Sequence, residues 1–85
     1  MKLPVIKSLV GFIQENDEDF VHETIEVLEH ISDAKGLKYE ELNVIGELLS
    51  NMYGALEVSK EVSNGVDEKK ALNGFMKRVL GSIDK

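Results

Sequence analysis

One segment carries the longest helical pattern in this 85-residue chain: residues 39–64, which read YEELNVIGELLSNMYGALEVSKEVSN. Its apolar residues recur at steps of three and four, which is the spacing of one helix face. Five of them form a seam like the a and d positions of a heptad: Leu42, Ile45, Leu49, Met52 and Leu56. With the residues beside this seam, the apolar positions cover about 200° of the helix, whereas a surface helix needs only about 100°. We therefore expect this helix to contact at least two other helices, or one helix and a second subunit.

Three further helical patterns flank this segment. The pattern predicts an all-α fold: a compact single domain over residues 1–85, with an antiparallel, bundle-like arrangement and a long central third helix. Pro4 suits the first position of a helix, Gly36 the residue after a helix end, and Asp67 an N-cap. The predicted helices are residues 4–15, 18–35, 39–64 and 67–83.

The second predicted helix divides into an apolar and a polar face. We expect its inner face to contain Phe20, Val21, Thr24, Ile25, Val27, Leu28 and Ile31. In the third helix, Gly46 and Gly54 each cost about 1 kcal/mol of helix propensity relative to alanine. A close approach by another helix would explain both glycines, and a kink near Gly54 is the alternative.

Composition and charge narrow the classes of partner. The net charge is −6, with −6 over residues 17–35 and +2 over residues 66–85. An acidic domain repels phosphate backbones, so we expect no nucleic-acid partner. The chain has no cysteine, which favours a reducing compartment. The start has no long apolar region typical of a signal peptide, and no apolar run reaches the roughly 20 residues that span a bilayer. These features predict a cytoplasmic protein with no membrane partner.

The sharpest candidate for ligand chemistry is the set His22, Glu26 and His30, spaced four and four along the second helix. Imidazoles and a carboxylate are good ligands for zinc or a similar divalent ion. The two histidines lie about 12 Å apart along the helix axis, so one ion does not readily bind all three side chains. A solvated polar face that contains two histidines is the competing interpretation.

The residue patterns of enzymes are missing from the sequence. The acidic residues of the second helix lie opposite its apolar stripe, where water keeps carboxyl groups from acting as general acids. The sequence has no calcium loop, no glycine-rich phosphate loop and no thiol nucleophile. We therefore predict a protein that is not an enzyme and has no cofactor.

Two short resemblances point to other functions. Residues 34–42, AKGLKYEEL, resemble the opening of a phage-repressor-type helix-turn-helix, which implies DNA binding. The sequence departs from that pattern at Glu47, Leu48 and Leu49, where the helix continues instead of turning, and residues 52–61 offer only Lys60 to a groove. The small acidic four-helix profile is also similar to acyl carrier proteins, but their Asp-Ser-Leu attachment motif is missing.

The wide apolar surface of the third helix is the better functional clue. It predicts a non-enzymatic helical domain for self-association or protein–protein interaction, most simply a homodimer or a complex with another protein. Tyrosine and methionine are common at interface centres. The candidate interface residues are Leu42, Ile45, Leu49, Met52, Tyr53 and Leu56. The alternative is a metal-binding or small-ligand-binding protein that uses the histidine and glutamate face of the second helix.

Overall fold

Four helices make up the fold, in a computed structural model that describes the backbone of residues 2–83 and the side chains of residues 2–79. The helices are α1 (Leu3–Glu15), α2 (Asp19–Ser32), α3 (Tyr39–Ser63) and α4 (Glu68–Ile83). The all-α fold class and the long third helix are confirmed, and α3 contacts each of the other helices. Met1, Asp84 and Lys85 of the predicted domain lie outside the described residues. None of the helices in the described range is long and apolar enough to cross a bilayer.

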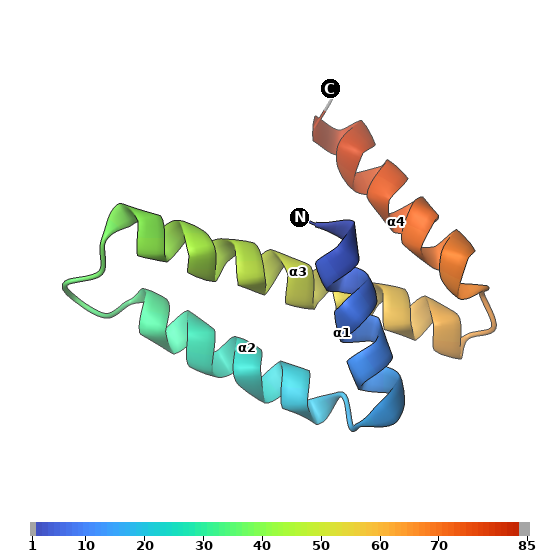
Figure 1. The fold of residues 1–85 in the computed structure, drawn as a ribbon, viewed down its shortest axis with the longest axis horizontal. Helices are drawn as coiled ribbons and strands as arrows, with labels where there is room; N and C mark the ends of the chain where they lie inside the picture. The colour runs from blue at the N-terminus through green and yellow to red at the C-terminus, as the bar shows by residue number, and fades with distance from the viewer. Residues whose placement is uncertain (1, 84–85) are drawn as a thin grey trace.

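Figure 1 shows how α3 supports the other helices. The α2 and α3 helices run antiparallel and form a hairpin, α1 crosses one side of α3, and α4 leaves the C-terminal end of α3 at an angle. The molecule is flat, with extents of 44 × 35 × 16 Å. The thin dimension holds about two helix layers, the hairpin and α1 across it, because packed helix axes lie about 8–10 Å apart.

The helix ends agree with the sequence except at the end of α2. That helix ends at Ser32, three residues before the predicted end. Gly36 does have a positive φ of 91°, but it lies within the loop and not directly after the helix. At the end of α3, the N–H of Gly65 donates to the Val62 carbonyl and the N–H of Val66 to the Glu61 carbonyl, which is the Schellman arrangement.

The core lies where α1 and α4 meet the C-terminal half of α3. Its buried apolar residues are Ile6, Val10, Ala55, Val58, Ala71, Leu72 and Phe75. A Cβ atom at Gly54 would lie 2.9 Å from the Phe75 ring and 3.3 Å from Ile6, so the predicted close approach is confirmed there. A Cβ atom at Gly46 would meet nothing within 4 Å, so the same prediction is wrong for Gly46.

Asn51 is the buried polar side chain of this core, with 2% of its surface exposed. Its Oδ1 accepts a hydrogen bond from the backbone N–H of Lys2 at 2.9 Å. Backbone N–H groups at the start of a helix have no partner within the helix. The bond therefore satisfies a polar group and fixes the start of α1 against the middle of α3.

Candidate interaction surface

One face of α2 is exposed although its residues are apolar. Phe20 is 58% exposed, Val27 57% and Ile31 38%. The predicted inner face of the second helix is therefore too wide, because only Val21 and Ile25 of α2 are buried. The remaining apolar residues of α2 face solvent.

A hydrogen bond marks one side of the α2–α3 hairpin. The Tyr53 hydroxyl donates to Glu29 Oε2 at 2.8 Å, so both side chains lie on the same side of the two helices. The pKa of the Tyr53 phenol is raised above its ordinary value, chiefly by this hydrogen bond and further by desolvation and the negative charge of Glu29. This side of the hairpin therefore carries a polar contact between α2 and α3.

The exposed apolar residues lie on the opposite side. Val27 and Ile31 are each two residues from Glu29, which places them about 200° around α2 at 100° per residue. Val44 and Leu48 of α3, which are 58% and 38% exposed, lie about 180° and 140° around that helix from Tyr53. The two helices therefore present these apolar side chains on a common side of the hairpin.

The α1 helix stands on this same side. Asn51, which binds the start of α1, is two residues from Tyr53 and so lies about 200° around α3 from it. At the other end of α1, the Phe12 ring meets the Phe20 ring edge-to-face, with centroids 6.0 Å apart. Phe12 is itself 42% exposed, so the apolar surface continues from α2 onto α1.

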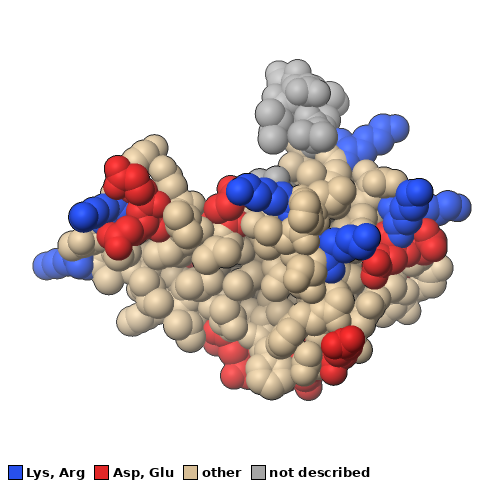
Figure 2. Space-filling model, viewed as in Figure 1, with Lys and Arg blue, Asp and Glu red and all other residues tan. Residues whose placement is uncertain are grey.

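We name this surface the hairpin face. It consists of Phe12, Phe20, Val27, Ile31, Val44 and Leu48. Figure 2 shows a region without acidic or basic side chains across the lower middle of the view, with acidic side chains along its lower edge and basic side chains above it. A hollow of about 350 Å³ lies where α1 meets the N-terminal half of α3, lined by residues that include Val5, Val44 and Leu48. The hairpin face thus has the shape of a step, with α1 as the raised part.

The exposed stripe of α2, which we call the α2 stripe, contains one hydroxyl group, and that group already has a hydrogen-bond partner. Thr24 Oγ1 donates to the carbonyl of Phe20 at 2.6 Å, which leaves its methyl group for contacts. Residues Phe20, Thr24, Val27 and Ile31 are spaced four, three and four, the spacing of a and d positions. This spacing was visible in the sequence, but the prediction assigned the whole apolar arc to the intramolecular core.

The predicted interface residues divide between two places. Leu42 and Tyr53 are 39% and 50% exposed, on the side of the hairpin opposite the hairpin face. The other predicted interface residues are half-buried along the hairpin: Ile45, Leu49, Met52 and Leu56. The structure therefore does not bring the six residues together on one exposed surface.

The predicted metal ligands His22, Glu26 and His30 are all exposed on α2. His22 Nε2 lies 3.7 Å from Glu18 Oε2, an exposed contact within one helix turn. In the part of the chain that the structure describes, no group of three or more histidine, cysteine, aspartate or glutamate side chains is placed to hold a metal ion. The metal site stays a prediction from spacing.

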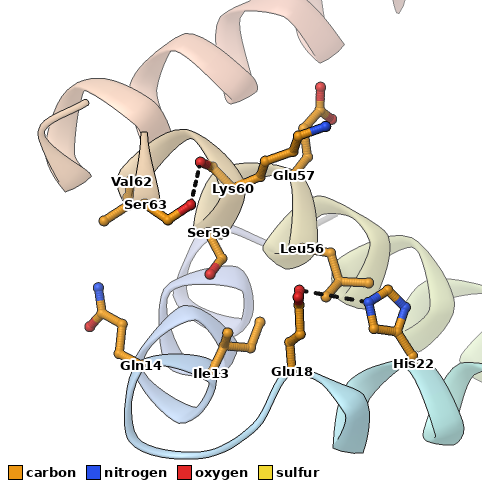
Figure 3. Close-up of a pocket in the computed structure, with 10 residues that line it drawn as sticks. All are labelled: Ile13, Gln14, Glu18, His22, Leu56, Glu57, Ser59, Lys60, Val62 and Ser63. Carbon is orange, nitrogen blue, oxygen red and sulfur yellow. Dashed lines mark hydrogen bonds and ion pairs between the residues drawn. The ribbon is translucent and has the colours of Figure 1, made fainter. Parts of the chain in front are cut away.

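A second hollow, of about 840 Å³, lies between the end of α1, the start of α2 and the C-terminal half of α3. Figure 3 shows His22 and Glu18 at one end of it, with Leu56 between them and Lys60. Glu26 and His30 do not line this hollow. Of the three predicted metal ligands, His22 alone lines this hollow. The three side chains therefore do not form a common site with it.

Comparison with known proteins gives one match. A family model matches residues 1–84, and it is described as a family of unknown function (DUF6952). No curated protein and no solved structure matches the chain.

Proposed function

The chain belongs to the DUF6952 family, whose function is unknown, and we propose that it is a non-enzymatic, cytoplasmic domain that associates with a second copy of itself. The observation that carries this proposal is an excess of exposed surface for a chain of this size. The mechanism is the removal of apolar side chains from water between two copies.

The excess can be put in numbers. The accessible surface is 6092 Å², whereas a folded monomer of this mass has about 5,000 Å². The radius of gyration is 13.8 Å, against about 12 Å for a compact chain of this length. The flat shape accounts for both differences, because a thin molecule leaves one face of its hairpin open and the other only partly covered by α1.

The size of the excess fits an interface. A standard protein–protein interface buries about 800 Å² per partner, which is close to the surplus of about 1,000 Å² over the monomer relation. The exposed apolar side chains are also contiguous, and contiguous apolar surface of this kind is typical of an interaction site. A second copy supplies a surface of the same size and the same apolar character.

Sedimentation equilibrium at increasing concentration tests the proposal. We expect the apparent mass to approach twice the 9.5 kDa of one chain as concentration rises, with a single monomer–dimer equilibrium describing all the data. A mass of one chain at every concentration up to the solubility limit would overturn self-association.

A further inference from the structure

We propose that two copies pack through their hairpin faces, with the two α2 helices antiparallel and related by a two-fold axis. This inference rests on the proposed self-association and adds the surface and the geometry. The occupant of the hairpin face is then the hairpin face of a second copy.

The α2 stripe is suited to pack on another helix. Its four residues Phe20, Thr24, Val27 and Ile31 keep the spacing of about 3.5 residues that helices use when they lie side by side. The stripe has no unpaired polar group, because the Thr24 hydroxyl is bonded within the helix. An interface along this stripe therefore leaves no polar group of the stripe without a partner.

The step in the hairpin face decides the orientation. The α1 helix stands at the N-terminal end of α2, where Phe12 contacts Phe20. The other end of the face, around Ile31 and Val44, is open. In a parallel pair the two α1 helices would meet each other, whereas in an antiparallel pair each α1 lies over the open end of the other copy.

Two-fold symmetry then places the centre of the interface. In a two-fold interface a residue meets its own equivalent only near the axis. The middle of the α2 stripe lies between Thr24 and Val27, so the axis passes close to these two positions. The four stripe residues are uncharged, so no charged group of the stripe has to lose its water at the centre of such a contact.

Single-cysteine variants test this geometry directly, because the natural chain has no cysteine. We expect Val27→Cys to form a disulfide-linked dimer under mild oxidation, since two equivalent positions beside the axis come within the short Cα–Cα distance that a disulfide needs. Glu26→Cys is the matched control. It lies one residue away and about 100° around α2, so its thiol should remain largely unlinked under the same conditions.

A charge on the stripe gives a second measurement. Val27→Glu should weaken association at least about 100-fold, because it buries an unpaired carboxylate at the centre of the interface. Tyr39→Glu adds the same charge at a residue that is 75% exposed, on the side of α3 that carries Tyr53, and should leave the dimer unchanged. Circular dichroism of both variants checks that they keep their helices.

The outcomes separate the two proposals. If the natural chain is a dimer but Val27→Glu is also a dimer and Val27→Cys does not crosslink, this surface is wrong and self-association stands. A natural chain that stays monomeric overturns both. Efficient crosslinking at Glu26→Cys instead of Val27→Cys would contradict the antiparallel α2 contact.

Discussion

At Gly54 the lack of a side chain allows the Phe75 ring and Ile6 to reach the backbone of α3. Phe75 is 3% exposed and Ile6 is fully buried, so neither has free space into which to move. A methyl group at this position would have to displace core side chains. Gly46, on the same helix, has no neighbour within 4 Å of its would-be Cβ and is exposed.

These two glycines make opposite predictions for the same substitution. Gly54→Ala should lower the free energy of unfolding by about 1–3 kcal/mol through overpacking. Gly46→Ala should raise it by up to about 1 kcal/mol, because alanine has the higher helix propensity. Urea unfolding followed by circular dichroism measures both, at a protein concentration held constant. Equal shifts for the two variants would contradict the close packing at Gly54.

The sequence could identify both glycines as exceptions within a helix, but it could not tell them apart. Helix propensity depends on the residue alone, whereas close approach depends on where another helix crosses. The α1 and α4 helices meet α3 in its C-terminal half, which contains Gly54 and not Gly46. That crossing point is a property of the tertiary structure, and a local sequence pattern does not contain it.

Among the elements, α4 begins at the N-cap that the sequence predicted. The Oδ2 atom of Asp67 accepts a hydrogen bond from the N–H of Lys70 at 3.3 Å. This bond satisfies one of the N–H groups that the first helical turn leaves without a partner. The Asp67 cap thus supports an element whose buried residues, Ala71, Leu72 and Phe75, complete the core.

Replacement of this cap should have a measurable cost. We expect Asp67→Ala to lower the free energy of unfolding by about 1 kcal/mol, and Asp67→Asn to cost much less because asparagine is an equally good N-cap. Thermal unfolding of the two variants side by side gives the comparison. If alanine and asparagine have the same effect, the side-chain bond does not stabilise α4.

Element boundaries were predictable where a capping residue acts at the helix end itself. Asp67 at the start of α4 is such a residue. The end of α2 was not predictable in this way. Gly36 was assigned to the helix end, whereas its positive φ lies within the loop that follows. The width of the apolar arc on α2 was also in the sequence, yet periodicity cannot say whether the same chain or another one covers it.

For the molecule as a whole, the net charge of −6 opposes association of two copies. Salt screens this repulsion, and it has little effect on apolar contacts at moderate concentration. We therefore expect the dimer to tighten when NaCl is raised from low to physiological ionic strength, by a few-fold in the dissociation constant. Sedimentation equilibrium at a series of salt concentrations checks this. Dissociation by salt would instead indicate that charge pairs, and not the hairpin face, hold the copies together.

The all-α class and the central position of the third helix followed from the sequence because both depend on helical periodicity and on the width of one apolar arc. The flat overall shape did not. It results from α1 and α4 both packing mainly on the C-terminal half of α3, which leaves most of the N-terminal half to α2. Four of the six predicted interface residues are half-buried along the hairpin, whereas Leu42 and Tyr53 are exposed, so the predicted interface stays a prediction.

The distribution of burial along the chain has a consequence for cooperativity. Within residues 26–50, which include the C-terminal half of α2 and the N-terminal half of α3, no residue is buried. A lone chain has little to hold this distal segment together beyond helix propensity and the half-buried contacts between the two helices. In the proposed dimer the second copy covers this segment, so folding and binding there become a single event. Under this proposal mass action would set how much of the chain is ordered, and the structure of the distal hairpin would depend on the protein's own abundance.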